Sequence, residues 1–506
     1  MNFNNRIRPL HHNNTTVMLL DSFVSPEDRD RLIKCREYWD FYEGYHWEGI
    51  EDFDKPQITK NYCRPFVDKF VAFEFGLGFV VKSLYDLNQE EQPVTKFLNE
   101  VWDDNKKNLL CLELGQVKSV TGDGWIQVRF ESPEELNDPF NEYEKGRIRI
   151  HVLPTEIVFP EYDQHDKDKL IKLTLAYPIN VQDTGLLRKT KFKQVLYRQV
   201  WTNESIEEYH GHDLIKDPMP NPYGTIPFVH IANTPIVGRT EGVSDLADLI
   251  SLNTELNLKT SDVSEILDYH SAPVTVVYGA KISSLEKGAG KMWGGLPKDA
   301  RIQNLELDSD LGASVSYIED LKTAMHEVGR VPEGALGGSQ AISNTSGVAL
   351  HFVNLPLIEK TRTKRLTTGE GLQKVNKLIL LFGLIHEMIT KPQDAKDFFK
   401  TDVDFPDTLP KDELILLQQL QMEMQLGLES RRGAMKKMGK EDIETTIAQA
   451  DEDRKQMQEE QMQLQMQQMA MQQAMFQQRN GELNSGMTNG STPKEEKRKA
   501  INGENK

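Results

Sequence analysis

The sequence predicts an α+β protein that is mainly helical. Runs that alternate apolar and polar residues, typical of strands, recur between residues 125 and 231. Apolar residues with helical spacing fill 25–76 and much of the chain beyond 240. The chain has 506 residues, enough for about three domains, and its cysteines, Cys35, Cys63 and Cys111, form no C-x-x-C motif. We therefore expect hydrophobic cores without a disulfide framework, in a reducing compartment.

Residues 1–239 are expected to form one α+β region. Aromatic residues recur with helical spacing over 25–76, among them Phe66, Phe70 and Phe73, and core packing explains such a stripe. Gly122-Asp123-Gly124 is a typical hairpin sequence, which predicts a turn before the first strand. The strands themselves are expected at 125–130, 148–153, 170–177, 192–201 and 223–231.

Residues 240–270 are expected to form one helix with an acidic stripe. This stretch holds seven acids against one lysine. Five of the acids are spaced 4, 3, 7 and 7 residues apart, which places them on one face of a helix: Glu241, Asp245, Asp248, Glu255 and Asp262. A solvated surface is the ordinary explanation for such a stripe. The alternative is a helix that turns its acids toward something that the protein must not hold.

The next hundred residues alternate between loops and helices. Residues 271–312 begin with a strand at 273–278 and then become glycine-rich and locally basic, with Lys281, Lys287, Lys291, Lys298 and Arg301. A helix is expected within 313–332, and a flexible Gly/Ser loop at 333–347. A long helix over 348–390 contains Pro356 and Gly369-Glu370-Gly371, which predict a kink or an interruption.

The C-terminal part is polar. A strand is expected at 403–405 and helices over 411–454. Glutamine and methionine dominate 455–478, where Met462, Met466, Met469 and Phe476 fit one helix-to-helix seam. Disorder is the alternative for this segment, because it has little to bury. Residues 479–506 are expected to be a disordered tail.

Motifs that carry chemistry are absent from the sequence. Gly290-Lys291 is no phosphate-binding loop, because Leu285 and Met292 occupy the places of the required Gly and Ser/Thr. The two His-Glu pairs lack the second histidine of a zinc helix, since Arg330 and Thr390 stand there. We expect no catalytic residue, cofactor or metal. The longest apolar run, 378–385, is far shorter than the roughly 20 residues of a membrane span, so no membrane association is expected.

The order of these segments resembles the portal, or head-to-tail connector, proteins of tailed double-stranded DNA phages. The resemblance covers roughly residues 35–453. It rests on several short matches taken in order: Tyr42-Glu43-Gly44, Lys60-Asn61-Tyr62, Phe66-Val67-Asp68, Phe75-Gly76, Ile226-Pro227 with Asn233, the stretch 253–273, Gly337-Gly338 through Ser346-Gly347-Val348-Ala349-Leu350, Pro356-Leu357, Gly427-Leu428-Glu429-Ser430, Met438-Gly439 and Glu441-Asp442.

The resemblance implies a dodecameric ring at one capsid vertex, in the virion and in the host cytoplasm during assembly. It implies a wing (1–239 and 348–410), a stem (240–270 and 313–332), a clip (271–312), a tunnel loop (333–347) and crown helices (411–454), followed by the segment 455–506. Double-stranded DNA would pass through the ring. The implied protein partners are the terminase large subunit, a head-completion adaptor, and the major capsid and scaffolding proteins.

The formal charge of −18 excludes tight phosphate binding and is compatible with a conduit. Gln340, Ser343, Asn344 and Thr345 in the tunnel loop would touch phosphates weakly, and an acidic stripe would repel the duplex. Two rival hypotheses remain: a coiled-coil scaffold or adaptor that assembles through the Gln/Met segment, and an enzyme with a dispersed site.

Overall fold

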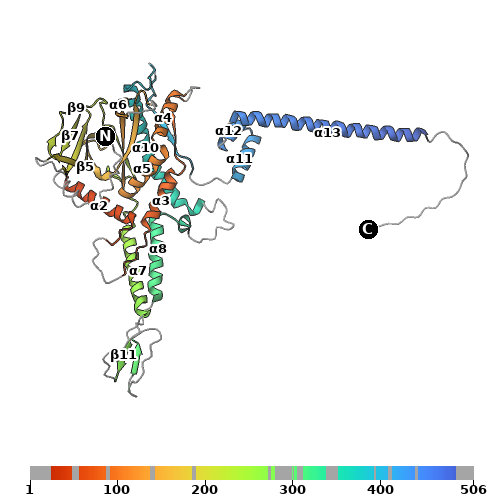
Figure 1. The fold of residues 1–506 in the computed structure, drawn as a ribbon. Coiled ribbons are helices and arrows are strands. Elements are labelled where there is room, and N and C mark those ends of the chain that lie inside the picture. Colours follow the sequence, from red (N-terminus) through yellow and green to blue (C-terminus); the bar gives the residue numbers. More distant parts are fainter. Residues whose placement is uncertain are drawn as a thin grey trace. The chain divides into compact units, whose positions relative to one another are not determined.

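The chain divides into two compact units, residues 1–410 and 411–506, and each is described by itself. The computed structural model describes residues 24–47, 56–86, 92–136, 143–184, 190–271, 275–279, 299, 301–304, 311–337, 351–392, 395–407, 413–438 and 443–485. Helices and antiparallel strands alternate along the first unit, and the described residues of the second are helical (Figure 1). The expected α+β class is confirmed.

A three-stranded antiparallel sheet lies at the centre of the first unit, in the order β10-β2-β3. Its strands are β2 (Asp123–Glu131), β3 (Arg147–Leu153) and β10 (Phe228–Ala232). Helices α5 (Lys107–Thr121) and α10 (Leu355–Ile385) contact it, and α3 (Cys63–Phe75), α4 (Pro93–Asp104) and α2 (Pro26–Glu43) pack around them. Trp102, Ile126 and Phe382 are fully buried in this core.

A second antiparallel sheet packs beside the first. It runs in the order β4-β5-β6-β7-β8, with β9 paired to β7. Trp125, Leu173 and Phe228 belong to the apolar cluster that joins the two sheets. The strands are β4 (Val158–Tyr162), β5 (Leu170–Thr184), β6 (Thr190–Thr202), β7 (Ser205–His210), β8 (Asp213–Leu214) and β9 (Met219–Pro220), and the short helices α6 (Pro133–Leu136) and η2 (Thr155–Ile157) connect neighbouring strands.

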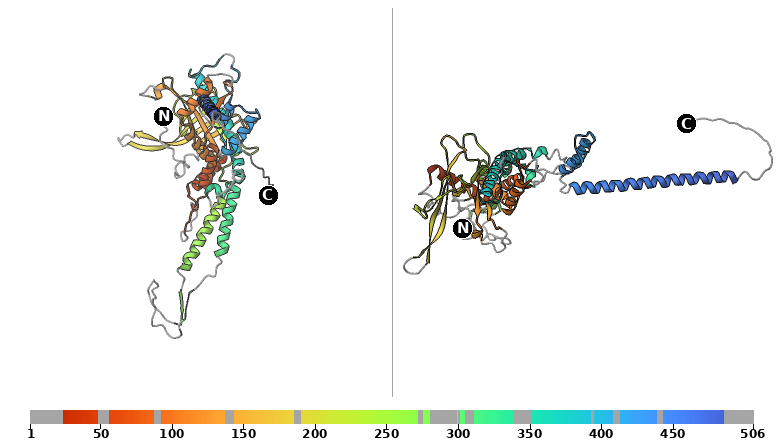
Figure 2. Two further views of the ribbon diagram at one scale, coloured as in Figure 1. Left: turned by 90° about the vertical axis from the view of Figure 1, so that its right-hand side faces the viewer. Right: turned by 90° about the horizontal axis from the view of Figure 1, so that it is seen from above.

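Two long helices extend from this body. Helices α7 (Ile250–Ser271) and α8 (Leu311–Gly329) lie side by side, as Figures 1 and 2 show. Between them in sequence, β11 (Thr275–Tyr278) and β12 (Arg301–Asn304) form a hairpin, and η3 (Glu333–Leu336) follows α8. A further antiparallel pair, β1 (Val80–Ser83) and β13 (Thr401–Asp404), joins a strand from the first quarter of the unit's sequence to one near its end.

The second unit contains α11 (Glu413–Gln425), α12 (Arg431–Lys437) and α13 (Ile443–Ser485). Lys437 binds Glu423 at 3.2 Å and Glu429 at 2.6 Å, and Arg431 pairs with Asp451 of α13. Helix α13 includes residues 455–478, for which disorder was the alternative, and it continues through 479–485, where a disordered tail was expected. Of the expected tail, residues 486–506 lie outside the described residues.

One local prediction was wrong, and the predicted interruption of the long helix was confirmed at one of its two expected places. Gly122 does not open a hairpin; it caps the C-terminus of α5 with a φ of 96°, a conformation that favours glycine, and β2 follows directly. The long helix is interrupted at Asn354, and Pro356 lies in the first turn of α10, where its missing N–H costs nothing. Helix α10 then continues through Gly369-Glu370-Gly371 without an interruption, contrary to expectation. A Cβ on Gly371 would collide with Ile231 of β10, so this glycine permits close packing of the helix on the sheet.

Candidate functional site

One face of α7 binds an extended backbone segment. Asn253, Asn257 and Ser261, spaced four residues apart, are at most 2 % exposed. Their side chains accept hydrogen bonds from the backbone N–H groups of Tyr62 (3.1 Å), Lys60 (2.9 Å) and Ile58 (3.2 Å). We call residues 58–62 the strap.

The strap accounts for the polar residues in the middle of α7. Asn and Ser are mediocre helix formers, and buried amides must be paired. Both the oxygen and the nitrogen of the Asn253 amide are paired, because Nδ2 also donates to the carbonyl of Lys60 at 2.9 Å. Asn257 Nδ2 contacts His46 Nδ1 at 2.7 Å. This face of the helix is therefore committed to contacts within the subunit.

The expected acidic stripe is only partly formed. Helix α7 begins at Ile250, so Glu241, Asp245 and Asp248 precede it in turns and do not share a helical face with the others. Glu255 and Asp262 do lie on α7, on the face opposite Asn253. Both are about one-third exposed and flank Lys259, whose Nζ lies 3.8 Å from Glu255 and 3.3 Å from Asp262. The helix expected over 240–270 thus starts ten residues late.

Backbone contacts explain why 242–246 is not helical. The Asp245 N–H donates to the carbonyl of Ser119 at 2.9 Å, and the Gly242 N–H donates to Asp123 Oδ1 at 2.8 Å. The Ser244 hydroxyl donates to the carbonyl of Val120. These bonds tie the segment to the end of α5 and the start of β2, so its N–H groups are not available for a helix.

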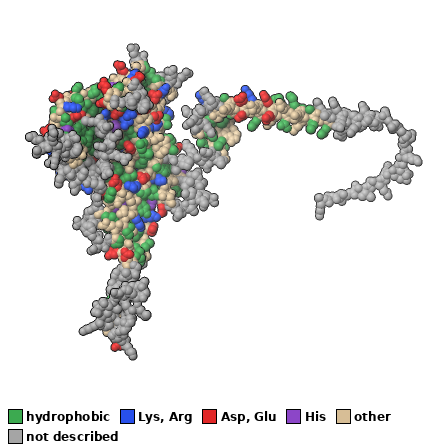
Figure 3. Space-filling model, in the orientation of Figure 1, with side chains coloured by type: hydrophobic (Ala, Val, Ile, Leu, Met, Phe, Trp, Pro, Cys, Tyr) green, Lys and Arg blue, Asp and Glu red, His purple; other side chains and the backbone are tan. Residues whose placement is uncertain are grey.

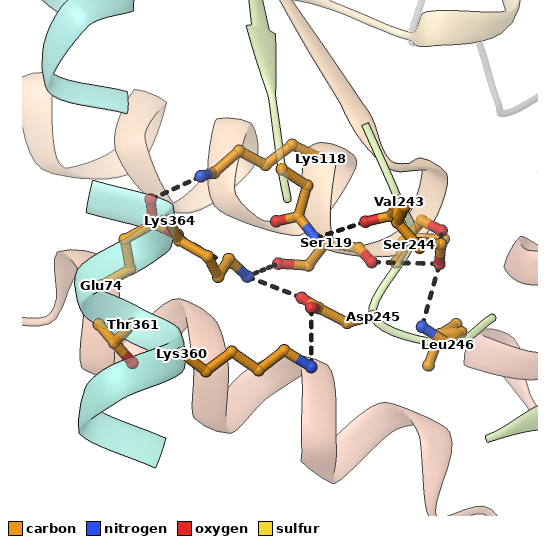
Figure 4. Close-up of polar contacts among 12 residues, drawn as sticks. Glu74, Lys118, Ser119, Val243, Ser244, Asp245, Leu246, Lys360, Thr361 and Lys364 are labelled. Carbon is orange, nitrogen blue, oxygen red and sulfur yellow. Dashed lines mark hydrogen bonds and ion pairs between the residues drawn. The ribbon is translucent and has the colours of Figure 1, made fainter. Parts of the chain in front are cut away.

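Asp245 belongs to a buried cluster of charged residues (Figure 4). Its carboxylate lies 2.7 Å from Lys364 Nζ and 3.1 Å from Lys360 Nζ, both on α10. Lys364 also donates to the Ser119 hydroxyl at 2.7 Å. We call this group, with Glu74, Lys118 and Thr368, the junction cluster.

The second half of the junction cluster joins α3, α5 and α10. Lys118 Nζ lies 2.6 Å from Glu74 Oε1 and 2.7 Å from the Thr368 hydroxyl, which itself donates to Glu74 at 2.6 Å. Glu74 Oε2 lies 3.8 Å from Lys364 Nζ, which links the two halves. The cluster therefore connects the segment that leads into α7 with three helices of the body.

Burial and ion pairing act in opposite directions on these groups. Burial alone would raise the pKa of Asp245, but the ammonium groups of Lys364 and Lys360 outweigh it and lower that pKa to about 2. Burial lowers the pKa of Lys118 to about 8, against the attraction of Glu74. Three lysines thus lie near two carboxylates, and of these five side chains all but that of Lys360 are almost fully buried.

Little in the sequence indicates this cluster. Lys360 and Lys364 lie in a helix that also carries many surface charges, and their partners are more than a hundred residues away. The available signal was the spacing: Leu357, Thr361, Lys364, Thr368 and Leu372 recur every three or four residues, which places both threonines and Lys364 on the buried face.

The basic and loop residues fall largely outside the described residues. This holds for Lys281, Lys287, Lys291 and Lys298, and for Gln340, Ser343, Asn344 and Thr345. Arg301 is described: it opens β12 opposite Tyr278, and both are exposed. At the start of the expected loop 333–347, Glu333 pairs with Lys322 of α8 at 2.5 Å, so this end of the loop is anchored to that helix.

A cavity of about 600 Å³ lies beside β2 and contains a His–Asp pair. His230 Nε2 is 2.7 Å from Asp123 Oδ1, and the imidazole packs on Trp125. Asp123 is also used structurally, since it binds the Gly242 N–H. Cys35 lines the cavity, but burial raises the pKa of its thiol, so it remains protonated. Asp123 therefore links His230 of β10 to the backbone at Gly242.

The described part of the chain offers no metal site and no membrane span. It contains no group of three or more His, Cys, Asp and Glu that could hold a metal ion. None of the helices described is both long and apolar enough to cross a membrane. All three cysteines are free and buried. On the face shown in Figure 3, acidic and basic side chains are interspersed rather than segregated.

The first unit thus combines an α+β body, a two-helix arm and a buried charge cluster that joins α3, α5 and α10. The family described as "Phage portal protein, SPP1 Gp6-like" matches residues 21–465, and the chain belongs to this family. Portal proteins are structural, non-enzymatic components of the phage virion that serve in viral genome packaging. No curated protein sequence matches the chain.

Proposed function

We propose that this portal protein forms a dodecameric ring at one capsid vertex, through which double-stranded DNA is packaged and ejected. The family match over most of the chain carries the proposal. The wing would comprise residues 1–239 and 348–410, the stem 240–270 and 313–332, the clip 271–312, the tunnel loop 333–347 and the crown 411–454. The ring would assemble in the host cytoplasm and remain in the virion.

The geometry of α7 supports weak contact with DNA. The strap covers the face with Asn253 and Asn257, which leaves the opposite face, with Glu255 and Asp262, for the channel. Lys259 between them offsets only part of their charge. A ring of such groups repels phosphates, and a translocating duplex then has few attachments to break. Glu241 and Asp248 are exposed outside the helix, and the buried Asp245 has no part in this surface.

The tunnel loop and the clip complete the proposal. Gln340, Ser343, Asn344 and Thr345 carry short neutral groups for transient contact with phosphates. The lysines of the clip and Arg301 would form a basic surface where the terminase large subunit docks during packaging and a head-completion adaptor docks afterwards. Contacts of the wing with the major capsid and scaffolding proteins follow from the vertex position.

Negative-stain imaging of the purified full-length chain tests the ring. We expect annular particles, and we expect them to persist when residues 455–506 are deleted, because the wing and stem carry the assembly. Persistent monomers or small dimers at high concentration would overturn the proposal. Loss of all oligomers on deletion would favour a scaffold that assembles through its Gln/Met helix.

A further inference from the structure

Helix α13 exposes an unusual number of apolar side chains. It has 43 residues, which gives a length of about 65 Å. Met457, Met462, Leu464, Met466, Met469, Met471 and Met475 are each 58–68 % exposed. A helix that buries so little is not stabilised within its own chain. Long exposed rows of methionine and leucine instead mark a surface that is covered in the assembled state.

The exposed apolar residues form two seams. Each residue of an α-helix turns by about 100°, so Met457, Leu464, Met471 and Met475 fall on one face, which we call seam A. Met462, Met466 and Met469 form seam B, which lies about 160° away around the helix. Two polar faces separate the seams. One carries Gln461, Gln465 and Gln472, and the other carries Gln456, Glu459, Glu460, Gln463 and Gln467.

The two seams determine what kind of partner fits. A two-stranded coiled coil needs one seam, which packs against the same seam of its partner. A helix with seams on opposite faces has room for a neighbour on each side. The seams also differ in spacing, 7, 7 and 4 residues in seam A but 4 and 3 in seam B. Contact between unlike surfaces is the arrangement that closes a ring of identical subunits.

We propose that α13 packs between two further copies of itself, with seam A of each helix against seam B of the next. The helices then form a closed palisade, in which the two polar faces point inward and outward. This inference rests on the proposed ring and adds a second interface to it, made by residues 455–475 and not required for the ring to form.

Paired cysteines in full-length annular particles test the palisade. Leu464 and Met466 lie on different seams but only about 3 Å apart along the helix. In the double variant Leu464→Cys/Met466→Cys, mild oxidation should join each subunit to the next and give a ladder of covalent oligomers on a non-reducing gel. The native cysteines do not interfere, because each is at most 2 % exposed.

Matched variants make the outcome specific. Leu464→Cys and Met466→Cys alone should remain monomeric on the gel, because a disulfide needs Cα atoms within about 7 Å and each seam meets only the other seam. Gln463→Cys/Gln465→Cys has the same offset but places the thiols on the polar faces, and should give no ladder. Rings without the ladder, or dimers from a single-seam variant, would overturn the palisade alone. Absence of annular particles would overturn both proposals.

Discussion

The carboxylate of Asp245 lies 2.7 Å from the ammonium group of Lys364, and both side chains are excluded from solvent. The pair connects the segment that leads into α7 with helix α10. A buried pair of this kind does not by itself make a strong contribution to stability, but the removal of one partner strands the other charge. Movement of α10 relative to residues 242–246 would therefore have to break this contact.

Replacement of Asp245 by Asn should be strongly destabilising. The change leaves Lys364 and Lys360 without their carboxylate, and breaking a buried pair in this way costs about 3–5 kcal/mol. Urea unfolding followed by circular dichroism would measure the loss. Asp248→Asn is the control, because Asp248 is exposed nearby and its loss should change the free energy of unfolding by less than about 0.5 kcal/mol. Equal effects of the two variants would contradict the structural role of Asp245.

Lys118 should make stability depend on pH in the alkaline range. Burial lowers its pKa to about 8 in the folded protein, from the ordinary lysine value of 10.5. Between these values the unfolded chain binds a proton that the folded chain has released, so the free energy of unfolding rises with pH. Comparison of the wild type with Lys118→Met isolates this contribution. The wild type should gain stability relative to the variant from about pH 8 to about pH 10.5. If the free energy of unfolding changed with pH in the same way for both proteins, the lowered pKa of Lys118 would be refuted.

Loss of Asn257 should release the strap. In Asn257→Ala the Lys60 N–H loses its acceptor, and an unpaired group of this kind costs about 1–3 kcal/mol. Amide hydrogen exchange at Lys60 should accelerate relative to the core of α5. Thr260→Ala is a suitable control, since the Thr260 hydroxyl donates within α7 itself, to the carbonyl of Leu256. Unchanged protection of Lys60 in Asn257→Ala would show that the strap is held by other contacts.

Charge reversal on the open face of α7 should turn a passive surface into a DNA-binding one. Glu255→Lys/Asp262→Lys replaces repulsion by attraction, and attraction of this kind weakens steeply with salt. Binding of short duplexes to assembled rings, followed by fluorescence anisotropy, should become tighter at low salt. Glu161→Lys/Asp213→Lys changes the charge equally on the second sheet and should have a smaller effect. Equal gains from both variants would mean that α7 does not face the DNA.

Local sequence patterns predicted most of the elements but not how they combine. The strands around Ile126, Ile150 and Leu175 alternate apolar and polar residues, and this pattern is visible without a structure. It does not show that β2 is buried on both faces, with Ile126 toward the helices and Trp125 toward the second sheet. The acidic helix was placed too early because the backbone of 242–246 bonds to α5, a contact across more than a hundred residues. Helical spacing is a local property, and tertiary hydrogen bonds overrode it.

The buried lysines show the same limit. Lys118 and Lys364 look like surface residues in sequence, since lysine is rarely buried unless paired. Their partners Glu74 and Asp245 lie on other elements, so no spacing rule connects them. The position of Gly122 in the fold was also ambiguous, because glycine with a positive φ occurs both in hairpin turns and at the C-termini of helices. Such choices are made by packing and not by the residues alone.

The pairing of β1 with β13 has a consequence for the order of folding. Val81 lies opposite Val403, so a short sheet near one end of the first unit is completed only by residues near its other end. During synthesis the ribosome must release the whole of α7, α8 and α10 before this pair can form. Contacts between such distant residues form late, because a long loop must first be closed. We therefore expect α7 and α8 to fold on the nascent chain before the pairing of β1 with β13 completes the body of the first unit.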